Sequence, residues 1–174
     1  DGAPAWGIQT NGSNVFGANV ISNITGGSGG IGMWVTNGNG GTAYGVHILS
    51  SSSSIFDNSS VTNIVGGAKG TSRYIADGTE GLSSSVYLDF TSSAKFTNNT
   101  LGNVTISTTS SGNTFILNNI SGTVNDTNGT NNYNGTFDGK NQGNIWKNIE
   151  NGSVDIDGTE ASSVLNHNIG ATGA

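Results

Sequence analysis

Apolar residues recur along this chain with a fixed period of about 40 residues. Phenylalanine recurs with this period, and aliphatic residues and one asparagine repeat around it in the same phase. Such repetition is typical of stacked units, each too small to close a core by itself. The repeating columns are Trp6, Val46 and Val86; Ile8, Ile48 and Leu88; Phe16, Phe56 and Phe96; Ile21, Val61 and Leu101; Asn23, Asn63 and Asn103; and Ile24, Ile64 and Val104.

The residue before each phenylalanine indicates which way the side chains face. It is Val15, Ile55 and Lys95 in the three copies, and a lysine belongs in solvent. Since neighbouring side chains in a strand point to opposite faces, we expect the phenylalanine column to form a stack in the core. Phe115 follows Phe96 after a shorter interval and should continue that stack. The intervening Gly, Asn and Ser favour short strands and turns over helices.

Two further stretches match between the first two copies. "MWVTNGNGG" (33–41) aligns with "RYIADGTEG" (73–81), and the Asn-Gly and Asp-Gly pairs within them favour tight turns. Few apolar residues follow these turns, so we interpret each 40-residue unit as one coil plus a strand-and-turn excursion on one side. The alternative is two coils of about 20 residues each. Beyond Val104 the spacing shortens to about 20 residues, a normal solenoid turn.

The sequence therefore predicts an all-β solenoid forming a single domain over residues 1–174. We place 40-residue repeats at about 6–45, 46–85 and 86–112, shorter coils at about 113–174, and a loop at 125–135. The composition by itself also suits a disordered linker, because Gly accounts for 29 residues and only 32% are hydrophobic. The regular apolar columns favour the solenoid.

Charge and cysteine content restrict the partners. The net charge is −6 with five Lys and Arg, which argues against nucleic acid and against anionic lipid surfaces. Cysteine is absent, so there are no disulfides and no thiol chemistry. No apolar run reaches the ~18 residues of a membrane span. We predict a secreted, extracellular or cell-surface protein; the opening "DGAPAWG" is what a processed or excised segment would show.

The motif F-x-x-N carries a family resemblance. It occurs at Phe16–Asn19, Phe96–Asn99 and Phe115–Asn118, whereas the second copy has Ser59 in place of the asparagine. The pattern resembles the right-handed parallel β-helix of the pectin lyase-like superfamily, and is similar to bacterial surface and autotransporter-type β-solenoids. This resemblance implies a right-handed parallel β-helix with a ladder of stacked asparagines inside the coil. The expected ladder is Asn23, Asn63 and Asn103, with Asn19 and Asn99 as rivals.

The chemistry of that family does not transfer to this chain. Its lyases use Asp-bound Ca²⁺ and a basic residue, but no carboxylates cluster around Arg73 or Lys95. Its hydrolases use an Asp-Asp pair and a Gly-His-Gly, and neither occurs. Asp57 and Asp89 are available for a two-carboxylate mechanism, yet nothing singles them out. We therefore assign no catalytic residues, and whether the protein is an enzyme stays open.

Two features remain as candidate sites. "DIDGTE" (155–160) holds part of a calcium loop in Asp155, Asp157 and Glu160, although a polar turn explains it equally, so no cofactor is assigned besides this Ca²⁺ candidate. Trp34 and Tyr74 occupy matching positions in the first two copies and, with Arg73, suit a contact surface for sugars or protein; the alternative is a local core. Ten N-x-S/T tripeptides leave glycosylation as a hypothesis.

The predicted function is structural or adhesive. Neither end shows a cap, so we expect either neighbouring domains of a longer chain or self-association, with coils stacking end to end in a surface layer or filament. The alternative is a carbohydrate-active or carbohydrate-binding β-helix, such as a polysaccharide lyase or hydrolase fragment or a phage tailspike-like domain. Ice binding ranks third, because the Ser and Thr runs do not repeat as a regular face.

Overall fold

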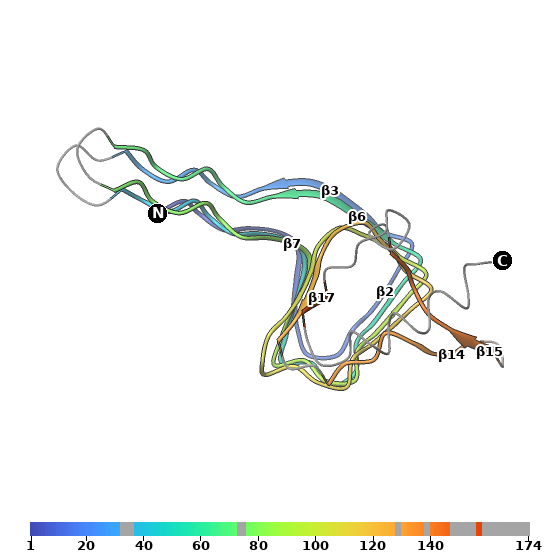
Figure 1. Ribbon diagram of the computed structural model, residues 1–174. Helices are drawn as coiled ribbons and strands as arrows, with labels where there is room; N and C mark the ends of the chain where they lie inside the picture. The colour runs from blue at the N-terminus through green and yellow to red at the C-terminus, as the bar shows by residue number, and fades with distance from the viewer. Residues whose placement is uncertain (32–36, 73–75, 128–129, 138–139, 147–155, 158–174) are drawn as a thin grey trace.

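The computed structural model describes residues 1–31, 37–72, 76–127, 130–137, 140–146 and 156–157. Within these ranges the chain is all β, with no helix, and it winds in successive coils (Figure 1). Each of the first four coils contributes one short strand to each of three parallel sheets, so that every strand pairs with its counterpart in the next coil. The fold is a β-solenoid built from stacked parallel strands.

Three sheets run along the axis of the solenoid. Sheet A contains β1 (Ala5–Asn11), β4 (Ala43–Leu49), β7 (Ser83–Asp89), β10 (Val104–Ile106), β13 (Val124–Asp126) and β17 (Ile156–Asp157). Sheet B contains β2 (Val15–Gly17), β5 (Ile55–Asp57), β8 (Lys95–Thr97) and β11 (Thr114–Ile116). Sheet C contains β3 (Val20–Thr25), β6 (Ser60–Val65), β9 (Thr100–Leu101), β12 (Asn119–Ile120) and β16 (Ile145–Trp146).

A short antiparallel hairpin departs from this pattern. It consists of β14 (Gly135–Phe137) and β15 (Lys140–Gln142) and lies between β13 and β16 in the chain. The segment 125–135, expected to be a loop, contains the end of β13 and the first residue of β14. Figure 1 shows the hairpin leaving the solenoid on the side opposite the long excursions.

A column of aromatic rings fills the core between the sheets. Phe56, Phe96 and Phe115 are fully buried, and the rings of Phe96 and Phe115 stack at 4.7 Å. Phe16, in the first coil, is only partly buried and packs on Phe56 from one side. Tyr133 extends the column beyond Phe115, with ring centroids 5.5 Å apart. The column faces inward because Val15, Ile55 and Lys95 occupy the opposite side of the same strands.

The register of sheet A differs from the uniform alignment of the three copies. Ile8, not Trp6, pairs with Val46, and Val46 pairs with Val86, so the first offset is two residues shorter than the second. The turn between β1 and β2 (12–14) is correspondingly shorter than the turn between β4 and β5 (50–54), and the longer offset is restored at Phe16 and Phe56. The alignments of Trp6 with Val46 and of Ile8 with Ile48 were therefore wrong: Trp6 pairs with Tyr44 and is 41% exposed, and Ile48 pairs with Thr10.

The excursions are insertions at one corner of the coil. In the third coil Asn103 is followed directly by Val104, which enters sheet A and pairs with Val86. In the first two coils, residues 24–45 and 64–85 separate Asn23 and Asn63 from the equivalent valines. Each long repeat is thus a coil like the third, 46–63 in the second copy, followed by an insertion. Figure 1 shows both insertions projecting together from the solenoid.

The expected ladder at Asn23, Asn63 and Asn103 was wrong. All three side chains are exposed, and Asn23 and Asn63 have positive φ angles of 59° and 55° at the corner where the insertions begin. Asparagine tolerates this left-handed conformation better than most residues. Asn23 and Asn63 therefore suit a corner that requires this backbone conformation, and none of the three side chains forms a core ladder.

The ladder inside the coil is formed at the rival position. The side-chain oxygen of Asn118 accepts hydrogen bonds from the backbone N–H and the side-chain amide of Asn99, at 3.0 and 2.9 Å. Asn144 accepts the same pair from Asn118. The column runs back through Ser59 to Asn19, whose N–H donates to the Ser59 hydroxyl at 3.0 Å. A second ladder joins Asn113 to Asn131.

Removing one rung should destabilise the solenoid. Asn118→Ala leaves the buried N–H of Asn99 without its acceptor and the Phe96 carbonyl without its donor, and each unsatisfied buried group costs about 1–3 kcal/mol. We expect a loss of at least about 2 kcal/mol in urea unfolding. The matched control is Asn119→Ala, the next residue, whose side chain is exposed and whose φ is not positive, and it should change stability by less than about 0.5 kcal/mol. Equal effects of the two substitutions would contradict the ladder.

Candidate functional site

The two insertions form one arm, defined here as residues 1–4, 26–31, 37–42, 66–72 and 76–82. Its segments are extended but form no regular strands. In Figure 1 they lie in two layers. One layer contains 26–31 and 66–72, and the other contains 37–42, 76–82 and the N-terminal residues. The arm is built almost entirely from backbone, because glycine occupies most positions between the layers.

Hydrogen bonds between glycines join the layers in an unbroken series. Gly27 donates to the Ala3 carbonyl, Gly41 to Gly27, Gly67 to Gly41 and Gly81 to Gly67, at 2.7–2.9 Å. A second series lies three residues farther from the solenoid in each segment. There Gly78 donates to the carbonyl of Gly70, Gly70 to that of Gly38, and Gly38 to that of Gly30. Spacing by three residues is the period of the polyproline II helix, whose backbone is otherwise left to solvent. The arm is therefore a two-layer bundle of polyproline II-like segments.

Hydrogen bonds within each layer connect the first copy to the second. Gly26 and Gly29 donate to the carbonyls of Val65 and Ala68, at 3.0 and 2.8 Å. In the other layer Gly40 donates to Thr79 at 2.8 Å, and Gly2 donates to Asn39 at 2.7 Å. Every backbone–backbone bond between described residues within a layer runs in the same direction, from an N–H of the earlier segment to a carbonyl of the later one.

The close approach of the layers explains the glycines. A Cβ atom on Gly67 would lie 1.9 Å from the carbonyl oxygen of Gly27, and one on Gly41 would lie 2.0 Å from that of Ala3. No side chain can occupy these positions without separating the layers. Glycines spaced by three residues in both copies are the sequence signal for this arrangement, and the patterns that predict strands and turns do not include it.

A methyl group between the layers should open the arm. We expect Gly67→Ala to abolish the protection from hydrogen exchange at the N–H groups of Gly67 and Gly81, because the layers must separate. Gly30→Ala is the matched control, since a Cβ at Gly30 meets no atom within 4 Å. Amide exchange followed by NMR measures both variants. Protection that survives in the Gly67 variant would refute the close packing of the arm.

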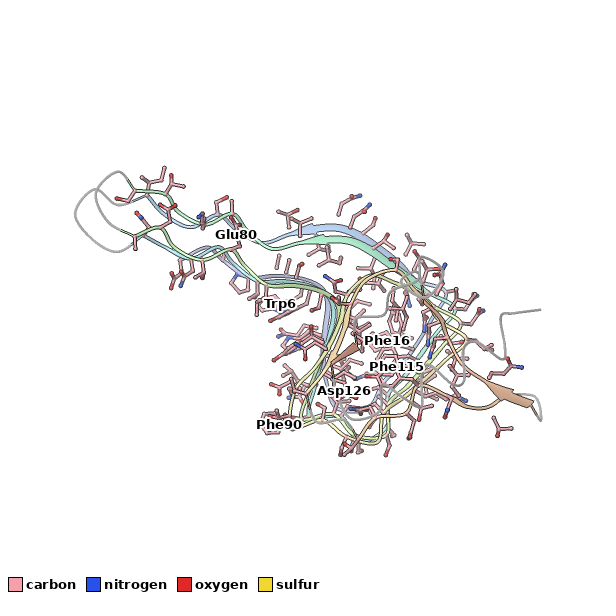
Figure 2. All side chains as sticks on the ribbon, in the orientation of Figure 1. Trp6, Phe16, Glu80, Phe90, Phe115 and Asp126 are labelled. Atoms are coloured by element: carbon pink, nitrogen blue, oxygen red, sulfur yellow. The ribbon has the colours of Figure 1, made fainter. Side chains whose placement is uncertain are left out.

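Aromatic side chains gather where the arm joins the solenoid. We call Trp6, Tyr44, His47 and Tyr87 the base cluster. The rings of Tyr44 and Tyr87 stack at 4.6 Å, and the His47 ring lies 5.2 Å from the first and 5.0 Å from the second. Figure 2 shows Trp6 in the angle between the arm and sheet A. Aromatic rings that keep an exposed edge are suited to contact with sugars or with protein.

The bend in sheet A brings these rings together. Gly45 and Val46 both face the core: a Cβ on Gly45 would lie 2.2 Å from the Val61 side chain, and Val46 is fully buried. Two successive inward residues break the usual alternation, so Tyr44 and His47 lie on the same outer face although they are three residues apart. The cluster therefore follows from the same bend that starts the arm.

His47 is the buried member of the base cluster. Its Nδ1 lies 3.4 Å from the side-chain amide of Gln9, and its buried Nε2 has no hydrogen-bond partner among the described residues. Burial lowers the pKa of His47, and the negative charge of Asp89 opposes this in part. Burial also raises the pKa values of the Tyr44 and Tyr87 hydroxyls, so both tyrosines stay neutral near pH 7.

The lowered pKa of His47 makes stability depend on pH. The folded protein favours neutral His47, so this contribution is fully present above the unfolded pKa of about 6.5 and is lost as pH falls below it. We expect the thermal midpoint of the wild type to fall more between pH 7.5 and pH 5 than that of His47→Gln. Glutamine is the matched choice because Gln9 occupies the equivalent position in the first coil. Parallel pH curves for the two proteins would contradict this role of burial.

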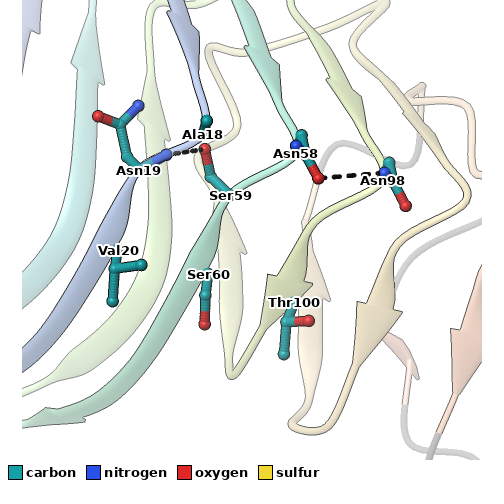
Figure 3. A pocket seen from close by; sticks show the side chains of 8 residues that line it. All are labelled: Ala18, Asn19, Val20, Asn58, Ser59, Ser60, Asn98 and Thr100. Carbon is teal, nitrogen blue, oxygen red and sulfur yellow. Dashed lines mark hydrogen bonds between the residues drawn. The ribbon is translucent and has the colours of Figure 1, made fainter.

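A polar groove of about 370 Å³ runs along the corner between sheets B and C (Figure 3). Ala18, Asn58 and Asn98 line it, all with positive φ, and the Asn98 amide donates to the Asn58 side chain at 3.3 Å. Asn58 and Asn98 both begin N-x-S/T tripeptides. The groove is shallow and carries no ionisable side chain, so it offers hydrogen bonding and no acid–base chemistry.

Most of the other predicted site residues lie outside the described ranges. Trp34, Arg73 and Tyr74 are among them. Asp155 and Glu160 are likewise not described, and Asp157 is described only as a backbone position of β17 that pairs with Asn125. The proposed contact surface and the calcium loop therefore stay predictions.

The described residues provide no group of three or more His, Asp or Glu side chains placed to hold a metal ion. The same part of the chain contains no helix of the length and hydrophobicity needed to span a membrane. Comparison with known proteins adds no family: no protein-family model, no curated protein and no solved structure matches this chain. Function must therefore be argued from the arm and the base cluster themselves.

Proposed function

We propose that this protein is an extracellular structural and adhesive β-solenoid that presents a stiff arm to its surroundings. The solenoid supplies length along one axis, and the arm supplies a contact element that projects from its side. The observation that carries this proposal is the backbone packing of the arm, in which glycine bonds glycine across two layers. Backbone hydrogen bonds to segments on several sides would hold this projection in an extended shape.

The fold and the chain composition support the same proposal. Parallel sheets and an inward asparagine ladder are features of the right-handed β-helix of the pectin lyase-like superfamily. We therefore propose that the solenoid is right-handed and that the protein is related to this superfamily. The negative net charge and the lack of cysteine suit a secreted or cell-surface protein. The predicted contact surface at Trp34, Arg73 and Tyr74 remains part of this proposal, since these residues lie in the sequence between the described segments of the arm.

The third coil provides the design for an arm-free variant. Deleting residues 24–45 and 64–85 joins Asn23 to Val46 and Asn63 to Val86, which copies the junction of Asn103 with Val104. Beads coated with wild type or variant at equal density are passed over a neutral polysaccharide, an acidic polysaccharide and a layer of the same protein. We expect retention under flow on at least one surface, and its loss without the arm. Equal retention of the two proteins on every surface would overturn the proposal.

Carbohydrate binding by the base cluster is the second candidate. The stacked rings of Tyr44 and Tyr87, with Trp6 beside them, favour it. The same beads carrying Tyr87→Ser, which keeps the arm, separate the two candidates. Loss of retention on polysaccharide alone would favour sugar binding at the cluster, whereas unchanged retention would assign adhesion to the arm. Release of sugar from the polysaccharide layers would instead indicate the enzymatic alternative.

A further inference from the structure

One edge of the arm has three backbone groups without a hydrogen-bond partner among the described residues, although their equivalents in the next segment of the arm are paired. The carbonyls of Val65 and Ala68 accept bonds from the first copy, whereas the equivalent carbonyls of Thr25 and Ser28 accept none from any described residue. Ala3 is equivalent to Gly41, whose N–H donates between the layers, and no described residue accepts from the Ala3 N–H. We call these three groups and the segment 26–31 the leading edge.

The opposite edge of the arm occupies two of its backbone N–H groups with its own side chains. The N–H groups of Lys69 and Ser72 donate to the carboxylates of Glu80 and Asp77, at 3.3 and 3.0 Å. The ammonium group of Lys69 lies 3.2 Å from the Asp77 carboxylate. The bond from Ser72, together with Lys69, lowers the pKa of Asp77, so this carboxylate stays charged at neutral pH. These carboxylates disfavour a further segment at this edge, whereas the segment 26–31 of the leading edge carries none.

The solenoid face beside the leading edge is also suited to contact. Ile8, Phe16 and Ile24 are only partly buried there, whereas Val46 and Phe56, the counterparts of the first two in the second coil, are fully buried. Between Asp1 and Asp57 the sequence contains no Asp, Glu, Lys or Arg. Depletion of charge is the compositional signature of the centre of protein interfaces.

We propose that the leading edge binds an extended, glycine-rich polypeptide segment in the polyproline II conformation, carried by a β-solenoid coil of the same kind. The N–H groups of this segment would meet the carbonyls of Thr25 and Ser28, and one of its carbonyls would accept from Ala3. Glycine is required where the segment crosses the layer beneath it, as at Gly67. The inference deepens the proposed function, on which it rests, by naming a partner for one face.

The direction of the hydrogen bonds excludes the simplest symmetric arrangement. Two copies that meet through their leading edges would place carbonyl against carbonyl. The reason is that every backbone–backbone bond within a layer runs from an N–H of the earlier segment to a carbonyl of the later one. A copy meeting the leading edge with its later coils would bring no arm, since β9 passes directly into β10. The partner must therefore carry its own glycine-rich segment, with N–H groups spaced by three residues.

A fusion presents such a partner at fixed stoichiometry. A second copy of Val46–Ser85 is placed before Ile8 in place of residues 1–7, because Ile8 occupies the position of Val86 in the register. The added copy also carries Glu80→Gly, matching Gly40 at the equivalent position, so that its Lys69 N–H has no carboxylate acceptor of its own. We expect the thermal midpoint to rise and exchange of the added Lys69 N–H to be slower than in a free peptide by about tenfold or more. Lys69→Pro in the added copy keeps the polyproline II backbone and removes that donor, so it should lower the midpoint again.

Ala68→Pro in the added copy is the matched control, because no described residue accepts from the Ala68 N–H. It should leave the midpoint of the fusion unchanged. A fusion with no gain in midpoint, or two proline variants with equal midpoints, would overturn the inference, and so would exchange at the added Lys69 as fast as in a free peptide. None of these readouts involves adhesion, so the inference can fail while the bead assay succeeds, and the reverse.

Discussion

Every part of this molecule depends on the hydrogen bonds between one coil and the next. These bonds lie parallel to the solenoid axis in all three sheets, and bonds between successive copies continue in the arm. Because identical backbone positions face each other from coil to coil, any side chain at such a position meets its own counterpart. The stacked phenylalanines, the asparagine ladder and the Tyr44–Tyr87 pair all follow from that one constraint.

The arm takes this constraint to its limit, because it has almost no side chains to pack. A strand in the solenoid is stabilised by a buried face as well as by its hydrogen bonds, whereas the glycine segments depend on backbone pairing on several sides. The stiffness proposed for the arm has the same origin as its sensitivity to substitution. The base cluster lies where the two modes of packing meet, and the bend at Gly45 and Val46 serves both.

The two edges of the arm differ in a way that bears on assembly. Asp77 and Glu80 occupy two N–H groups of one edge with negative charge, which disfavours a further segment there. The leading edge presents carbonyls beside a coil face that has no charged side chains. The partner proposed for the leading edge would give the molecule one preferred direction of extension, which suits a structural protein.

The sequence by itself determined the repeat, the short strands and the inward phenylalanine column, because a regular period and the alternation of side chains are both visible in the order of residues. It did not determine which of two repeating asparagines faces inward. Asn99 turns into the core because the residue before it, Asn98, has a φ of 56°, whereas Asn63 itself adopts the left-handed conformation and stays outside. A uniform offset also misplaced Trp6, since the first turn is shorter than its counterpart. Only the tertiary structure paired glycine with glycine across the arm, because that contact depends on how closely the backbones of distant segments approach.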